Sequence, residues 1–205
     1  MSRWVGRANV AKRLAPLEDT PGRSVFAGGE ARFEMEHETI VARPPFPLRH
    51  EAEYERVRVA PLLEEIAEDH VVGAVLVRLG GYAVGVLEGE RLAASKVGRR
   101  PVHGRHRAGG SSASRFRRRR EEQARALLED AGEAAARVLE PHRARLEAVA
   151  LGGDRTAVRR MIELRPGLAW LDELALARFF TVPEPRQAVL ERLPYDLYAI
   201  EFTSS

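Results

Sequence analysis

The 205-residue sequence contains no cysteine, and only 6% of its residues are aromatic. The absence of cysteine excludes disulfides, a thiolate nucleophile and metal centres held by cysteine. The sequence also lacks the HExxH, GxSxG and nucleotide-loop signatures of common enzyme classes. Its histidines and carboxylates form no cluster typical of a metal site, so we expect neither a metal nor a cofactor.

Long apolar runs are absent as well. No segment approaches the roughly 18 apolar residues that cross a bilayer, and residues 1–13 lack the apolar core of a secretory signal. The hydrophobic content of 44% is nevertheless too high for a disordered chain. We therefore expect a soluble, cytoplasmic protein with no membrane partner, and nothing in the sequence requires more than a monomer.

Acidic residues are missing from residues 91–120, and this segment holds eleven of the 33 basic residues. The eleven are Arg91, Lys96, Arg99, Arg100, Arg105, Arg107, Arg115, Arg117, Arg118, Arg119 and Arg120. Because the net charge of the chain is +3, the remainder carries −8. Such clustered arginine is typical of a surface that contacts phosphates, since the guanidinium group binds them through paired hydrogen bonds. The alternative is a solvated loop and helix face in an arginine-rich protein.

The secondary-structure signals in the sequence are weak over residues 1–55 and clearer after them. Prolines and paired glycines interrupt residues 1–55, where only a helical turn at 10–14 and one or two strands within 31–41 are indicated. The PPFP segment at residues 44–47 suits neither a helix interior nor a central strand and is interpreted as a linker. We expect an N-terminal extension of unclear structure over residues 1–55 and one domain over residues 56–205.

Three β-rich runs follow a predicted helix that starts at Pro61. They occupy residues 71–77, 82–88 and 91–97. Short turns containing glycine join them, which is typical of an antiparallel meander.

A long helix is predicted after a loop at residues 99–110. Its apolar positions follow helical spacing from about residue 112 to residue 140, and Ser111 or Ser112 can cap its start. Four consecutive arginines lie in its first turns, close to the end of the helix dipole that favours anions. A bound anion would offset this unfavourable placement.

The remaining sequence adds an α/β unit. Residues 146–151 are predicted as a strand, and Gly152 and Gly153 lead into a helix that Asp154 caps. The two glycines lack the context of a phosphate-binding loop, so we interpret them as a tight turn. Helices are predicted at 168–177 and 185–193, an extended piece at 178–182 and a strand at 197–202. These elements predict an α/β (α+β) fold with a mixed, largely antiparallel sheet and a long helix after the glycine loop.

Residues 103–123 read HGRHRAGGSSASRFRRRREEQ. This segment resembles the loop and helix of the middle domain of eukaryotic and archaeal class I peptide chain release factors, which have the form HGRGGQSxxRFxRxR. The matching residues are His103, Gly104, Arg105, Gly109, Gly110, Ser112, Ala113, Arg115, Phe116, Arg118 and Arg120. The segment GGYAVGVLEGERLAASKVGRRPVHGR is most similar to the Vms-like branch of this family. The resemblance covers about residues 71–151.

The resemblance implies a release-factor middle-domain fold and a peptidyl-tRNA hydrolase that rescues stalled large ribosomal subunits. It places Gly109, Gly110, Ser111 and Ser112 at the catalytic centre, where glycine lets the backbone approach a ligand closely. Its implied partners are the large ribosomal subunit, rRNA and peptidyl-tRNA. The expected RNA contacts are Lys96, Arg99, Arg100, His103, Arg105, His106, Arg107, Arg115, Arg117, Arg118, Arg119 and Arg120.

Two departures from the family pattern bear on the chemistry. Residues 106–108 are inserted before the double glycine, and Ser111 stands where the family has the glutamine that helps to place water at the ester. Gln123 lies about twelve residues further along the helix, roughly 18 Å away. Three alternatives stay open: ester hydrolysis without glutamine, cleavage of the tRNA 3′ end, and a catalytically silent factor that binds the ribosome or tRNA. Without the resemblance, a generic RNA-binding α/β domain is the interpretation that remains.

Overall fold

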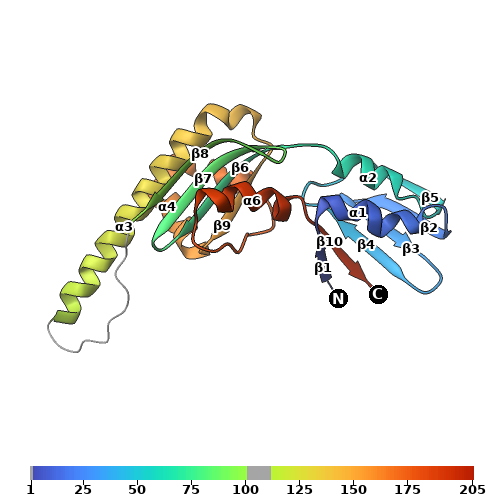
Figure 1. Cartoon of the computed structure of the whole chain (residues 1–205), viewed down its shortest axis with the longest axis horizontal. Coiled ribbons are helices and arrows are strands. Elements are labelled where there is room, and N and C mark those ends of the chain that lie inside the picture. The colour runs from blue at the N-terminus through green and yellow to red at the C-terminus, as the bar shows by residue number, and fades with distance from the viewer. Residues whose placement is uncertain (1, 101–111) are drawn as a thin grey trace. The chain divides into compact units, whose positions relative to one another are not determined.

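The computed structural model describes residues 2–100 and 112–205. The chain forms two compact units, one made of Met1–Asp69 with Leu193–Ser205 and the other of His70–Arg192 (Figure 1). These bounds differ from the division at residue 55 that the sequence suggested. The difference arises because the last strand of the chain pairs within the sheet of the first unit, and local sequence patterns do not encode such a distant pairing.

A six-stranded antiparallel sheet builds the first unit, in the order β1-β10-β4-β3-β2-β5. Its strands are β1 (Ser2–Val5), β2 (Pro21–Ala27), β3 (Glu30–Glu34), β4 (Thr39–Arg43), β5 (Ala52–Arg56) and β10 (Ile200–Ser204). Buried Phe26, Phe33 and Phe202 form a core with residues of α1 (Arg7–Leu14) and α2 (Ala60–Ile66). A short 3-10 turn, Ala15–Leu17, follows α1. The structure confirms the predicted turn at 10–14, and β3 and β4 overlap residues 31–41, where one or two strands were predicted.

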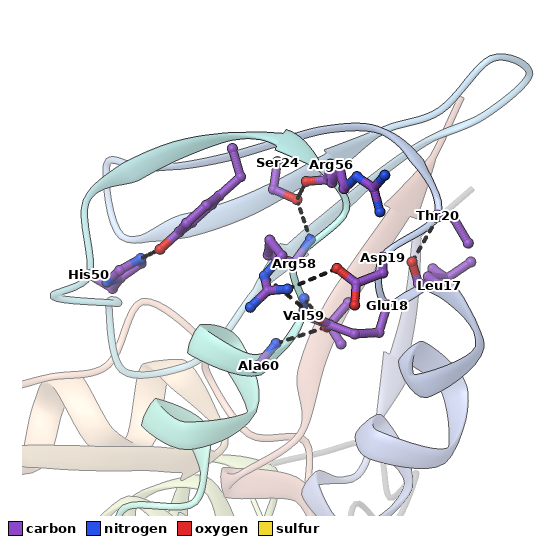
Figure 2. A network of polar contacts seen from close by, with 11 residues as sticks. Leu17, Glu18, Asp19, Thr20, Ser24, His50, Arg56, Arg58, Val59 and Ala60 are labelled. Atoms are coloured by element: carbon purple, nitrogen blue, oxygen red, sulfur yellow. Dashed lines mark hydrogen bonds and ion pairs between the residues drawn. The ribbon is translucent and has the colours of Figure 1, made fainter.

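A polar network ties the segment between β5 and α2 to the start of β2 (Figure 2). Ser24 is fully buried, and its hydroxyl donates to the Arg56 carbonyl at 3.0 Å and accepts from the Arg58 backbone N–H at 2.8 Å. The Glu18 carboxylate accepts from the backbone N–H of Val59 at 2.6 Å. Because buried polar groups are costly when they lack partners, this network fixes one arrangement of the two segments.

A mixed four-stranded sheet builds the second unit, in the order β8-β7-β6-β9. Strands β6 (Val71–Arg78), β7 (Gly81–Glu88) and β8 (Arg91–Arg99) form an antiparallel meander. Strand β9 (Ala148–Gly153) runs parallel to β6. The predicted meander and the predicted α/β fold with a mixed, largely antiparallel sheet are confirmed.

Helices cover both faces of this sheet. Helices α3 (Ser112–Leu139) and α4 (Arg155–Leu164) pack on the face that carries Val75, Val84 and Val86. Gly85 alternates with Val84 and so lies on the opposite face, where the buried Leu190 of α6 (Gln187–Leu197) approaches it. Three short helical elements complete the unit: Glu140–Arg145, Pro166–Leu168 and α5 (Trp170–Glu173).

Two local predictions need correction. The helix expected over 168–177 is reduced to Pro166–Leu168 and α5, because the following residues instead form isolated parallel bridges to β9, Val149 with Ala175 and Gly152 with Phe180. Gly152 and Gly153 form the end of β9 rather than a tight turn. At Gly153 φ is +98°, and an added Cβ would lie 2.1 Å from a backbone oxygen of β6.

Asp154 caps α4 as predicted. Its carboxylate accepts hydrogen bonds from the backbone N–H groups of Thr156 at 2.8 Å and Ala157 at 3.1 Å. These are the amides that a phosphate would need, so the Gly152-Gly153 segment does not present a free phosphate cradle. Within the described part of the chain, no helix has the length and apolar character needed to cross a membrane.

Candidate nucleic-acid interface

Helix α3 consists of a docked part and a projecting part. The docked part, from Leu127 to Leu139, contributes Leu127, Leu128, Ala131, Ala134, Ala135 and Leu139 to the core. Between residues 115 and 126, no residue whose burial is described is buried. Figure 1 shows that this part of α3 extends beyond the sheet. We define residues 112–126 as the α3 arm, which at 1.5 Å per residue is about 22 Å long.

Arginines surround the α3 arm. Arg115, Arg117, Arg118 and Arg119 are exposed and Arg120 is half-buried. Successive helical residues are about 100° apart, so four consecutive arginines point in four directions rather than along one face. Among the described residues only Arg118 of these five has a carboxylate partner, Glu122, at 3.0 Å. A helical segment that is charged on all sides needs a solvated or oppositely charged environment, and phosphates provide one.

The other two arginines of α3 are paired within the helix. Arg125 pairs with Glu129 at 2.9 Å, and Arg137 pairs with Glu133, in each case across four residues. The uncompensated positive charge of α3 is therefore confined to the first turns of the arm.

Ion pairs fix the segment that enters the predicted glycine loop. Arg99, the last residue of β8, donates from Nε to Glu184 Oε1 at 3.0 Å. Hydrogen bonds from Arg186 and Arg99 lower the pKa of Glu184 to about 2. Arg100 donates from Nη2 to Asp130 Oδ2 of α3 at 2.7 Å. Both arginines were predicted as RNA contacts, and the structure places both in ion pairs with carboxylates of the same unit.

Tyr82 of β7 packs against Gly98 near the end of β8. Tyr82 is 7% exposed, and its ring occupies the space beside Gly98, where an added Cβ would lie 2.3 Å from Tyr82 Cζ. Burial raises the pKa of Tyr82. Lys96, a predicted RNA contact, lies on β8, where it pairs with Val84 of β7, and its side chain is exposed. Sequence reasoning missed Tyr82, as it missed the two carboxylates that hold β8, because these contacts join positions far apart in the chain.

The predicted catalytic segment lies largely outside the described residues. His103, Arg105, His106, Arg107, Gly109, Gly110 and Ser111 belong to the undescribed part, and Ser112 is the first residue of α3. The predicted start of the long helix is thus confirmed, whereas the catalytic role of the serines stays a prediction. In residues 2–100 and 112–205, no group of three or more acidic or histidine side chains is placed to hold a metal ion.

Comparison with curated proteins finds archaeal translation factors. The peptide chain release factor subunit 1 of Archaeoglobus fulgidus is 29% identical over 120 residues, which are 57% of this chain and 29% of that protein. The protein of the same name from Aeropyrum pernix is 29% identical over 158 residues, which are 74% of this chain and 42% of that protein. The chain therefore spans less than half the length of each of these relatives.

Two solved structures that align with this chain have related descriptions. The crystal structure of the archaeal translation termination factor aRF1 aligns over 94% of this chain and 55% of that chain, with 21% identity and a TM-score of 0.47. A structure described as the Vms1 mitochondrial localization core aligns over 95% of this chain and 80% of that chain, with 13% identity and a TM-score of 0.43.

A family model matches residues 70–203, which include the whole second unit and most of the C-terminal segment of the first. The model describes the Actinobacteria/chloroflexi VLRF1 release factor, acVLRF1. The match covers more than half of the chain and confirms the resemblance to Vms-like release factors. The chain belongs to the acVLRF1 release factor family.

Proposed function

We propose that this chain hydrolyses the ester of peptidyl-tRNA on stalled large ribosomal subunits and thereby rescues them in the cytoplasm. One observation of the structure carries the proposal beyond the family name. The α3 arm presents four arginines that have no carboxylate partner among the described residues, and it begins two residues after Gly110 in the sequence. A phosphate-binding helix next to a segment that can approach a ligand closely is the arrangement that tRNA-ester chemistry needs.

Hydrolysis adds one water molecule across the ester. The water oxygen bonds to the carbonyl carbon, the bond to the ribose oxygen of the tRNA breaks, and that oxygen takes up a proton from the water. The step needs a hydrogen-bonding group that orients the water or stabilises the developing oxyanion, and losing one such group costs on the order of 3 kcal/mol. In this proposal Gly109 and Gly110 bring the backbone to the ester, and Ser111, with Ser112 beside it, supplies the hydroxyl at the position of the family glutamine.

The arm arginines hold the RNA while the ester reacts. Each neutralised phosphate contributes a slope of about −0.7 to −0.9 to the dependence of log affinity on log salt. Four phosphates on the α3 arm therefore predict an affinity loss of about 50- to 150-fold between 50 and 200 mM salt.

The test uses large subunits that hold a labelled peptidyl-tRNA, with products resolved as intact peptidyl-tRNA, free peptide and tRNA 3′ end. Free peptide with intact tRNA is the expected product. Peptide that carries a few nucleotides would contradict ester hydrolysis and identify tRNA cleavage. Co-sedimentation with the subunit without any product would contradict the enzyme and leave a binding factor.

Variants locate the chemistry. Ser111→Ala should slow hydrolysis by about 100-fold if its hydroxyl orients the water, consistent with a loss of roughly 3 kcal/mol. Ser111→Gln should hydrolyse the ester at least as fast as the wild type does. Ser114→Ala is the matched control, and its hydrolysis rate should equal that of the wild type. Equal rates for Ser111→Ala and wild type would remove the side chain of Ser111 from the mechanism.

A further inference from the structure

The four-stranded sheet of the second unit has two ends with different charge. We define the loop end as the end from which the chain enters the predicted glycine loop. It combines residues 78–81, 98–100, 153–155 and 178–186, because Arg78 pairs with Gly81, Gly81 with Arg99, and β9 ends beside β6 and Phe180. These segments contain six basic and two acidic residues. The opposite end, residues 70–71, 88–91 and 140–147, contains three basic and four acidic residues.

Three arginines of the loop end contact neutral groups. The Arg155 guanidinium carbon lies 4.2 Å from the ring centre of Phe179, and that of Arg178 lies 5.0 Å from the ring centre of Phe180. Arg78 donates from Nη1 to a backbone carbonyl, that of Val182, at 2.8 Å. At Arg78 and Arg155 these neighbours orient the guanidinium groups without cancelling their positive charge.

Stacking on an aromatic ring prepares an arginine to bind phosphate. The ring holds the guanidinium plane, while the N–H groups at its rim stay able to donate two parallel hydrogen bonds. Because the side chain is already oriented, less conformational freedom is lost on binding. Arg78 and Arg155 have no carboxylate partner among the described residues, so a phosphate would meet uncompensated charge there.

Arg159 extends the same charge along α4. It is exposed and lies four residues after Arg155, so the two side chains are neighbours on the helix surface. Like charges at this spacing destabilise a helix, and neither arginine has a carboxylate partner among the described residues. A bound anion would offset this repulsion, as it would on the α3 arm.

We propose that Arg78, Arg155 and Arg178 form a second RNA phosphate-binding surface at the base of the α3 arm. This inference rests on the proposed function, since the RNA is the tRNA or rRNA that the arm engages. The arm is about 22 Å long, so contacts at its tip and at its base bind the RNA backbone at two separate places. Two separated contacts fix the direction of the arm, which a single contact cannot do.

The test compares Arg155→Gln and the double variant Arg155→Gln/Arg178→Gln with wild type. Affinities for purified large ribosomal subunits and for free tRNA are measured between 50 and 300 mM salt. Loss of two phosphate contacts should lower the salt slope by about 1.4 to 1.8 and weaken binding about 25- to 60-fold near 100 mM salt. The single variant should lower the slope by about 0.7 to 0.9 and weaken binding about 5- to 8-fold.

Arg143→Gln is the matched control. Arg143 is also exposed and lies over an aromatic ring, 4.9 Å from the centre of Trp170, but it belongs to the opposite end of the sheet. Its replacement removes the same charge and the same kind of stacking, and it should leave affinity and slope unchanged. A loss as large as that of Arg155→Gln would show a general charge effect and overturn the proposal.

A third variant, Arg117→Gln/Arg119→Gln/Arg120→Gln, separates this inference from the proposed function. Weak binding by this arm variant together with normal binding by the double variant would overturn the second surface alone. Normal binding by both would overturn the proposed function as well. Weaker binding of free tRNA by the double variant would identify tRNA as the ligand of the second surface, and weaker binding of subunits alone would identify rRNA.

Discussion

Neutralising the α3 arm should weaken RNA binding without weakening the fold. The informative variant is Arg117→Gln/Arg119→Gln/Arg120→Gln, which keeps the ion pair between Arg118 and Glu122. Glutamine and arginine have similar helix propensities. The variant removes two like-charge pairs, Arg115 with Arg119 and Arg117 with Arg120, each worth about 0.2–0.5 kcal/mol. The helical arm should therefore become more stable by about 0.4–1 kcal/mol.

The same variant removes three phosphate contacts. The salt slope should fall by about 2.1 to 2.7, which near 100 mM salt corresponds to an affinity loss of about 100- to 500-fold. Binding to large subunits across a salt series measures the slope, and urea unfolding measures the global stability. A stability loss above about 1 kcal/mol would mean that the arginines make intramolecular contacts, and an unchanged slope would mean that they do not meet phosphates.

Three further predictions concern the scaffold. Leu127→Ala should lower the free energy of unfolding, measured by urea titration, by about 2–5 kcal/mol, because Leu127 is fully buried between α3 and the sheet. The control Leu79→Ala, at a residue that is 51% exposed, should change this free energy by less than about 0.5 kcal/mol. The lowered pKa of Glu184, about 2 against an ordinary 4.5, means that its ionised form contributes stability above pH 4.5 that is lost as the pH falls toward 2. The difference in unfolding free energy between wild type and Glu184→Gln should therefore be constant above pH 4.5 and shrink below it, and a constant difference down to pH 2 would contradict the ion pairs. Gly80→Ala should cost about 1–2 kcal/mol because φ is positive there but the added methyl group meets no described atom within 4 Å. Gly153→Ala should cost about 1–3 kcal/mol more, because its added methyl group would collide with a backbone oxygen, and thermal unfolding would rank the two variants.

Local signals were enough to predict most elements of the second unit, although not the end of β9 or the short helical elements within residues 166–173. Hydrophobic runs separated by glycine turns predicted β6, β7 and β8, and helical spacing predicted α3. Asp154 as a cap is a local feature and was also predicted. The composition of the first unit was not predicted, because β10 joins β1 and β4 only through a pairing between the two ends of the chain.

The candidate site shows the same division between local and distant information. Charge counting identified the basic segment but treated its arginines as equivalent. The structure separates them, because Arg99 and Arg100 are paired with Glu184 and Asp130, which lie 85 and 30 residues away in the sequence. Such pairs depend on which strands and helices end at the same place, so the sequence alone cannot distinguish an anchoring arginine from one that is available to RNA.

The projecting arm links the stability of the protein to its binding. A helical segment of about 15 residues is marginally stable in water when it lacks tertiary packing, and in the α3 arm the like-charge pairs weaken it further. A ligand that binds only the helical form stabilises it by mass action. RNA bound to the arm arginines should therefore slow hydrogen exchange of the arm amides far more than exchange in the docked part of α3. In the triple variant the free arm should exchange more slowly and the added protection by RNA should nearly disappear. The arginines that destabilise the free helix are then the same groups through which RNA stabilises it.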